Sequence, residues 1–146
     1  MSGTAEPSTP GRVLGLDLGD VRIGVAISDP ERRLAVPFGT VHVGSPPGEL
    51  RAIATLVDDN DVSLIVLGHP LLLSGERGER ASHAEEFADA LRAFVKVPVV
   101  LHDERLSSVE ADRRLAAAGA DGRTRRRAVD QTAATVILQA FLDRAR

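Results

Sequence analysis

The apolar positions along the chain alternate or run together in five short stretches, which predicts five strands. The stretches are residues 12–17, 22–28, 34–43, 62–67 and 97–101. The first two flank the turn signal Gly19-Asp20, so we expect them to form a hairpin. Pro37 interrupts the third stretch and lacks an amide hydrogen, which indicates a strand near the edge of the sheet. The fourth stretch is almost wholly apolar, as expected for a strand covered on both faces.

Helical spacing of apolar residues predicts four helices, at about residues 46–60, 82–95, 107–119 and 130–144. Ser107 is expected to cap the third helix, where Glu110 completes a capping box. In the last helix, a rotation of about 100° per residue puts Asp130 on the same apolar face as Ala134, whereas Gln139 falls on the opposite face. Asp130 should therefore point toward the sheet.

A meander of three strands, followed by alternating helices and strands, is the element order of a ribonuclease H-like fold. We therefore expect an α/β fold with a mixed five-stranded sheet, a β-meander at its start and flanking helices. Residues 12–146 are predicted to form this single ribonuclease H-like domain. Residues 1–11 are polar and lack the apolar core of a signal peptide, so we expect a disordered N-terminal tail.

The composition excludes several classes of function. The 146 residues include no Cys, which excludes disulfides, thiolate metal sites and a Cys nucleophile and fits a reducing cytoplasm. With four Phe and no Trp or Tyr, stacking of bases on aromatic side chains should not dominate a nucleic-acid contact. No apolar run is long enough to span a bilayer, so no membrane partner is expected. The net charge of −3 argues against attraction of nucleic acid to the whole surface.

Three acidic residues are candidates for catalysis and metal binding. Asp17 ends the first strand, Glu104 follows the fifth, and Asp130 lies on the apolar face of the last helix. The expected topology brings all three to one edge of the sheet, where close carboxylates raise one another's pKa unless a cation neutralises them. Oxygen ligands of this kind suit Mg²⁺ or Mn²⁺, which can activate water for hydrolysis of a phosphodiester.

Each acid also has a plainer explanation. Asp17 is equally suited to cap the turn that follows it. Glu104 has an ion pair with Arg105, or a place in solvent, as its alternative. Asp130 has the position of a helix N-cap, which Asp favours. These alternatives stay open at the level of sequence.

Basic residues supply candidate contacts to a phosphate backbone. Arg22 lies on the strand that returns after Asp17, and Arg105 follows Glu104. A run of arginines lies shortly before Asp130, and it comprises Arg123, Arg125, Arg126 and Arg127. This run predicts a local basic patch, with a solvated flexible loop as the alternative.

The histidines show no spacing typical of a zinc site, and no glycine-rich nucleotide-binding loop is present. His69 follows Gly68 at the end of a predicted strand, on the side of the candidate acids. It is a candidate for positioning a substrate phosphate, and a structural loop histidine is the alternative.

Spaced motifs along the chain resemble those of a known family. They cover residues 15–19 with 22–26, 66–70, 103–108, and 129–134 with 137–139. In this order they resemble the YqgF family, the RuvC-like group of pre-16S rRNA nucleases that is also described as Holliday junction resolvases. The resemblance extends over about residues 12–144, which is nearly the whole chain.

The resemblance implies a ribonuclease H-like fold, a bacterial cytoplasmic setting and metal-dependent cleavage of nucleic acid with Mg²⁺ or Mn²⁺. It also implies that Asp17, Glu104 and Asp130 are the catalytic acids, and that the reaction matures the 5′ end of 16S rRNA. The chain departs from the family pattern at residues 20–21, 69 and 72–74. These departures leave the acids intact and affect phosphate contacts and substrate preference.

The sequence thus predicts a metal-dependent endonuclease that acts on structured RNA in ribosome biogenesis. One alternative is a Holliday junction resolvase acting on branched DNA, for which a homodimer is expected because two symmetric cuts are needed. Another is a non-catalytic RNA-binding factor for ribosome assembly. A sugar kinase-like ATPase is a further rival, but such folds need a second lobe for which the chain looks too short.

Overall fold

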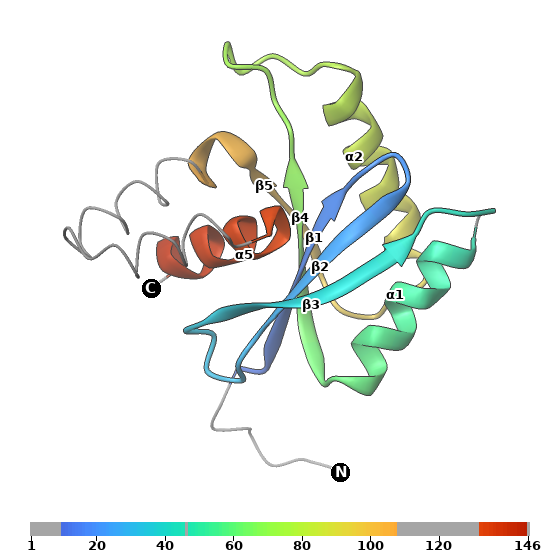
Figure 1. The fold of residues 1–146 in the computed structure, drawn as a ribbon, viewed down its shortest axis with the longest axis vertical. Coiled ribbons are helices and arrows are strands. Elements are labelled where there is room, and N and C mark those ends of the chain that lie inside the picture. The colour runs from blue at the N-terminus through green and yellow to red at the C-terminus, as the bar shows by residue number, and fades with distance from the viewer. Residues whose placement is uncertain (1–9, 46, 108–131, 146) are drawn as a thin grey trace.

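The computed structural model describes residues 10–45, 47–107 and 132–145. Its elements are β1 (Arg12–Leu18), β2 (Arg22–Ser28), β3 (Ala35–His42), α1 (Gly48–Asp59), β4 (Val62–His69), α2 (Glu79–Arg92), β5 (Val99–Asp103) and α5 (Ala133–Arg144). Figure 1 shows the strands as one central sheet, with α1 and α2 on one side of it and α5 on the other. The predicted mixed five-stranded sheet with flanking helices is therefore confirmed.

The strand order is β3-β2-β1-β4-β5, and it decides where the functional residues lie. The first three strands form an antiparallel meander, whereas β4 runs parallel to both β1 and β5. Leu16 on β1 pairs with Leu67 on β4, which in turn pairs with Leu101 on β5. As a result β1, β4 and β5 all end at the same edge of the sheet, which we call the carboxyl edge.

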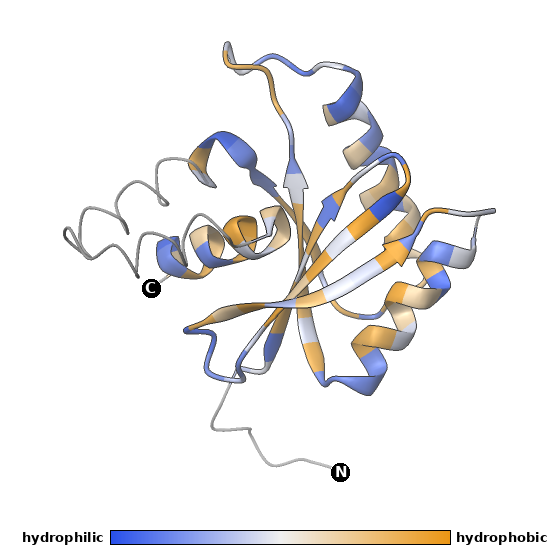
Figure 2. Cartoon of the chain, in the orientation of Figure 1, coloured by the Kyte–Doolittle hydropathy of each residue, from blue (hydrophilic) through white to orange (hydrophobic). Residues whose placement is uncertain are grey.

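Two separate hydrophobic clusters hold helices to the two faces of the sheet. Leu14 and Leu16 belong to the larger cluster, which lies between the sheet and the helices α1 and α2. Val13 belongs to the smaller cluster, in which Leu138 and Leu142 of α5 pack on the other face. Figure 2 shows how apolar residues dominate the central strands that both clusters share.

Helix α5 lies very close to the sheet because a glycine is beneath it. A Cβ atom added to Gly15 would lie 2.8 Å from Leu138 Cβ and 3.3 Å from the carbonyl oxygen of Ala134. The first distance is shorter than real Cβ contacts, so any other residue here would push α5 away from β1. The close approach sets the distance between α5 and the strand that ends with the candidate acid Asp17.

Helix α5 corrects two expectations about its ends and its faces. It begins at Ala133 after the N-cap Thr132, whose Oγ1 accepts a hydrogen bond from the amide of Thr135 at 3.2 Å. The N-cap is therefore Thr132 and not Asp130, and Asp130 itself lies outside the described residues. The prediction that Gln139 faces away from the sheet is wrong, because this residue is buried.

The burial of Gln139 has a clear physical cause at the edge of the sheet. Its Oε1 accepts a hydrogen bond from the amide of Ala35 at 2.8 Å, and its Nε2 donates to the carbonyl of Arg33 at 3.0 Å. The side chain thus satisfies backbone groups where β3 begins, which would be costly to bury without a partner. Helical periodicity alone cannot detect a polar residue of this kind.

The remaining differences concern the start and end of helices. Helix α2 begins and ends three residues earlier than predicted, at Glu79 and Arg92. The prediction that Ser107 is an N-cap is wrong, because Glu104 to Ser107 are already helical. Asp103 supplies the cap, since its Oδ1 accepts a hydrogen bond from the amide of Arg105 at 3.0 Å. Glu110 lies outside the described residues.

The third predicted strand is at an edge of the sheet, as Pro37 indicated, because β3 pairs with β2 and with no other strand of the described residues. The pairing shifts register between Val25 and Ala26, where β3 contains an irregularity next to Pro37. The predicted tail, residues 1–11, falls mostly outside the described part of the chain, which begins at residue 10. No helix within the described ranges is long and apolar enough to cross a membrane.

Candidate active site

Asp17 lies near the end of β1, on the face of the sheet that α5 covers. A Cβ atom added to Gly24, its partner on β2, would lie 3.8 Å from Asp17 Cβ and 3.6 Å from Ala134 Cβ. The Asp17 side chain therefore leaves the backbone between β2 and the first turn of α5, and the residue is half-buried. Burial raises the pKa of Asp17, and the positive charge of Arg80 opposes this rise in part.

Glu104 reaches the same face of the sheet from the first helical residue after β5. A Cβ atom added to Gly68 would lie 2.7 Å from Glu104 Oε2 and 2.9 Å from Ile137 Cδ1. The carboxylate therefore lies over the end of β4, in space that any side chain at position 68 would occupy. Burial raises the pKa of Glu104, and the charge of Asp17 raises it further. The two predicted acids thus meet at the carboxyl edge, although they are far apart in the sequence.

The structure decides between the explanations left open for these two acids. No hydrogen bond from a backbone amide reaches the Asp17 carboxylate within the described residues, so the turn-cap alternative is wrong. Arg105 pairs with Asp103, at 2.7 Å from Nη2 to Oδ2, and not with Glu104. Both candidate acids therefore lack a direct cationic partner in the part of the chain that the structure describes.

The third predicted acid, Asp130, lies outside the described residues. Among residues 10–45, 47–107 and 132–145, no group of three acidic, histidine or cysteine side chains is close enough to hold a metal ion. The described structure thus brings together Asp17 and Glu104, and the three-acid site stays a prediction.

A pocket of 240 Å³ opens beside Glu104, between the turn that joins β1 to β2 and the start of α2. It is lined by Leu18, Gly19, Asp20, Gly68, Pro70, Glu79, Arg80, His83, Ala84 and Glu104. Half of these lining residues are polar or charged, and Glu104, one of the two acids, is among them. The pocket is therefore the natural place for a substrate group that approaches the carboxylates.

Arg80 and His83 are two pocket residues that the sequence did not predict. Arg80 makes no hydrogen bond or ion pair with another described residue, yet its charge lowers the pKa of both Asp17 and Glu104. The sequence predicted that helix α2 begins only at about residue 82. A helix beginning at Glu79 places residues 80 and 83 on one face, and that spacing is the signal that could have identified them.

His69 belongs to a separate cluster on α2. Its Nε2 lies 2.7 Å from Glu85 Oε2, and Arg77 Nε donates to the same oxygen at 2.8 Å. Hydrogen bonds from Arg77 and then His69 lower the pKa of Glu85, so this carboxylate is ionised and holds both partners. A structural histidine makes this kind of contact, and the role of His69 in positioning phosphate stays a prediction.

The predicted basic contacts fall into two groups. Arg22 is exposed at the start of β2, at the carboxyl edge. Arg105 is partly exposed and bonded to Asp103 on one side. The other four predicted contacts, Arg123, Arg125, Arg126 and Arg127, lie outside the described residues. The structure therefore places two basic side chains near the acids.

The geometry agrees with the comparison to known families. The family model described as RuvX, Holliday junction resolvase, matches residues 11–144. The chain belongs to the RuvX family. The resemblance to YqgF proteins noted from the sequence is thereby confirmed.

Curated relatives in the RuvX family cover nearly the whole chain. A protein from Roseiflexus sp. (strain RS-1) is 42% identical over 136 residues, which are 93% of this chain and 96% of the relative. A protein from Anaeromyxobacter sp. (strain K) is 47% identical over 133 residues, covering 91% of this chain and 97% of the relative. Both carry the name "Putative pre-16S rRNA nuclease". These relatives confirm the predicted class of function, a hydrolase acting on ester bonds of nucleic acid.

A solved structure supports the fold of this RuvX-family chain. RuvC of T. thermophilus in complex with a Holliday junction substrate has a TM-score of 0.58 and 15% sequence identity. The match covers 92% of this chain and 94% of the RuvC chain. At this identity the likeness shows the fold alone, and it confirms the predicted ribonuclease H-like fold.

Proposed function

We propose that this RuvX-family chain is a metal-dependent endonuclease that cleaves structured RNA, in maturation of the 5′ end of precursor 16S rRNA. One observation carries the proposal. Asp17 and Glu104 come from distant segments, are half-buried side by side, and lack a direct cationic partner within the described residues. Two such carboxylates repel each other, and a bound cation would relieve that repulsion. The names of the curated relatives support the same substrate.

The donor set fits a hard divalent cation. Mg²⁺ and Mn²⁺ prefer carboxylate oxygens, and Asp17 and Glu104 offer these within reach of each other's charge. Asp130 would be the third ligand. In the sequence it precedes by two positions Thr132, which caps the end of α5 that adjoins Asp17. When bound, the metal would supply a Lewis acid for the phosphate and a water of lowered pKa for attack on phosphorus.

The protein's own residues would prepare the site for that chemistry. The raised pKa of Glu104 means that this group must lose its proton before it can serve as a ligand. Gly68 leaves the space in which the carboxylate lies. Arg80, which faces the pocket without a partner among described residues, would bind non-bridging oxygens of the scissile phosphate.

Basic residues around the edge would hold the strand by its phosphates. Arg22 and Arg105 would contribute at the rim, together with Arg123, Arg125, Arg126 and Arg127. His69 would act at most indirectly, through its charge beside Glu104. Precursor rRNA as substrate would place the enzyme in the cytoplasm.

Branched DNA is the second candidate substrate. The family description names a Holliday junction resolvase, and the RuvC structure of the same fold holds such a junction. Phosphate contacts do not distinguish RNA from DNA. A resolvase should be a homodimer, because it must make two symmetric cuts. A non-catalytic assembly factor is the third candidate, and it would bind RNA without cutting it.

The test compares the Asp17→Asn variant with Asp58→Asn, which makes the same charge change on the exposed side of α1. Both proteins and the wild type are assayed on precursor 16S rRNA, a four-way DNA junction and linear DNA, with Mg²⁺ and with Mn²⁺. We expect the wild type and Asp58→Asn to cut precursor rRNA equally, and Asp17→Asn to lose at least about 10²-fold in kcat.

Three results would contradict the proposal in different ways. Undiminished cleavage by Asp17→Asn would show that Asp17 is not a catalytic residue. Cleavage of the junction by a homodimer, with precursor rRNA left intact, would establish the resolvase. Tight binding of RNA without cleavage under every metal condition would establish the assembly factor.

A further inference from the structure

The loop between β4 and α2 carries an exposed leucine above the carboxyl edge. Leu73 has a relative exposure of 94%, against 54% for Leu34 at the opposite end of the sheet. Figure 2 shows the apolar stretch at the start of this loop, at the top of the view. A single exposed leucine is ordinary on a protein surface. Two features distinguish Leu73: the loop holds its backbone in a fixed conformation, and the loop is attached next to Glu104.

The tip of the loop is a closed turn. The amide of Gly75 donates to the carbonyl of Leu72 at 2.8 Å, and the amide of Leu72 donates to the carbonyl of Glu76 at 3.0 Å. Gly75 has a φ of +93°, which favours glycine at this position. Ser74 Oγ donates to Glu76 Oε1 at 3.0 Å. The backbone on both sides of Leu73 is therefore fixed by hydrogen bonds.

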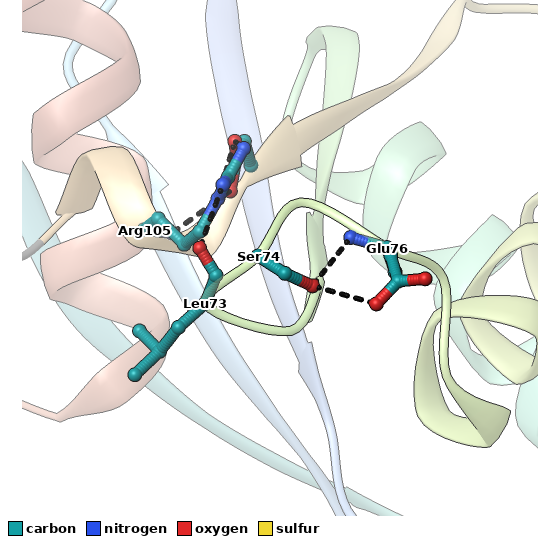
Figure 3. A network of polar contacts seen from close by, with 5 residues as sticks. Leu73, Ser74, Glu76 and Arg105 are labelled. Atoms are coloured by element: carbon teal, nitrogen blue, oxygen red, sulfur yellow. Dashed lines mark hydrogen bonds and ion pairs between the residues drawn. The ribbon is translucent and has the colours of Figure 1, made fainter.

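Arg105 fastens this turn to the strand end that carries Glu104. Its Nη1 donates to the carbonyl of Leu73 at 3.3 Å, while its Nε and Nη2 bind Asp103. A Cβ atom added to Gly75 would lie 3.3 Å from the same Nη1, so the guanidinium lies directly under the turn. Figure 3 shows the Leu73 side chain pointing away from Arg105. The leucine thus projects from the protein at a fixed place, held to the residue that follows Glu104.

The surroundings favour nucleic acid over protein as the group that meets Leu73. The residues that follow it, Ser74 to Arg77, are small, polar or charged. Leu72 is 52% exposed, and it is directed back toward Gly78, where an added Cβ would lie 3.5 Å from Leu72 Cδ2. Two leucines on a polar turn are too small for a protein interface, which needs a far larger area. A nucleobase presents a flat apolar face of matching size.

Near this site an aliphatic side chain, and not an aromatic one, is available to contact a base. The four Phe residues are at positions 38, 87, 94 and 141, and none lines the pocket. Leucine is among the residues that other nucleic-acid-binding proteins insert between base steps. We propose that Leu73 packs on the exposed face of a terminal base pair, where a duplex meets a single strand. It would thereby select structured substrates for the acids below. This inference rests on the proposed function.

The first experiment measures base unstacking directly. A hairpin with a single-stranded tail carries 2-aminopurine at the boundary, in RNA and DNA versions, and fluorescence is read in metal-free buffer with protein in excess. We expect the wild type and the matched control Leu34→Ser to raise the fluorescence. Leu73→Ser should bind without raising it. An equal rise with Leu73→Ser, or no rise with the wild type on either hairpin, would overturn the proposal.

The second experiment measures selection in cleavage with Mn²⁺. Leu73→Ser should lower kcat/KM on the hairpin about tenfold, the scale of one lost base contact, and change it less than about twofold on a linear strand. Equal losses on both substrates would overturn the role in selection. Wild-type protein that cuts neither substrate would sink the proposed nuclease function, while the fluorescence result would still decide whether Leu73 unstacks the base. A response to RNA but not DNA would identify the natural polymer.

Discussion

The two faces of strand β1 differ in the size and charge of their side chains. Leu14 and Leu16 are fully buried against α1 and α2. Gly15 and Asp17, which alternate with them, face α5. Strand β4 repeats the contrast, because Leu67 is fully buried beside Gly68, which makes room for Glu104.

This contrast separates stability from chemistry within single strands. Burial of large aliphatic side chains stabilises the fold mainly on the face of α1 and α2. On the other face, near the carboxyl edge, glycines leave space in which two repelling carboxylates are held. Because the stability of the fold depends less on packing at the α5 face, two carboxylates that repel each other can be kept there. A bound cation would relieve their repulsion.

The sharpest way to test the contrast is Leu16→Ala, next to Asp17 on the same strand. Loss of a fully buried leucine should lower the free energy of unfolding by about 2–5 kcal/mol. The protein that stays folded should keep its cleavage rate, because Leu16 faces away from the acids. Urea denaturation and a cleavage assay at low temperature measure the two effects.

The control Leu34→Ala, at an exposed position, should change the free energy of unfolding by less than about 0.5 kcal/mol. A large loss of kcat in folded Leu16→Ala would contradict the separation.

Gly68→Ala should impair both properties, because it acts on the face of α5. Its methyl group would meet Glu104 and Ile137, so we expect about 1–3 kcal/mol of destabilisation and about a 10²-fold fall in kcat from displaced Glu104. Gly48→Ala is the matched control, since nothing lies within 4 Å of a Cβ added there. Full activity of Gly68→Ala would mean that Glu104 does not need its place over β4.

The raised pKa values predict how cleavage depends on pH. A carboxylate must lose its proton to bind metal, so activity should fall as pH drops through the pKa of Glu104, which burial places above the ordinary 4.5. A profile of kcat/KM at low Mn²⁺ should show this acid limb above pH 4.5. More Mn²⁺ should move the limb to lower pH, because metal and protons compete. If the pH of the acid limb does not change with Mn²⁺ concentration, Glu104 is not a metal ligand.

The smallest effect is expected on the stability of metal-free Asp17→Asn. Burial raises the pKa of Asp17 above the ordinary 3.8. Ionisation of Asp17 in the folded state therefore lowers stability as pH rises from 3.8 through the raised pKa. At neutral pH the variant should therefore melt a few degrees higher than the wild type. Mn²⁺ should stabilise the wild type and not the variant. A lower melting temperature for the metal-free variant would mean that Asp17 has a structural partner.

Patterns of period two predicted the sheet well, since strand β2 runs from Arg22 to Ser28 as expected. They also identified Asp17 and Glu104, because strand ends converge in this topology. They could not show which of the neighbours Gly68 and His69 lies on the face of the acids, because the apolar run of β4 carries no alternation. For that reason the pairing of His69 with Glu85 was not foreseen.

Polar and charged residues on helices were harder to predict. Helix α2 has Gly78 as its N-cap and no side-chain cap, which hid the turn that brings Arg80 to the pocket. Gln139 was misplaced because its burial depends on backbone groups of β3 that are distant in the sequence. The second error arises from a tertiary contact, which no local pattern records.

The bond from Ala35 to Gln139 joins residues that are 104 positions apart. Through it the last helix completes the edge of the hairpin sheet that the N-terminal part of the chain forms. On the ribosome, the meander would emerge long before α5, with its α5-facing side still bare. That side therefore stays uncovered until almost the whole chain has been made, and exposed apolar surface of this kind favours aggregation during synthesis.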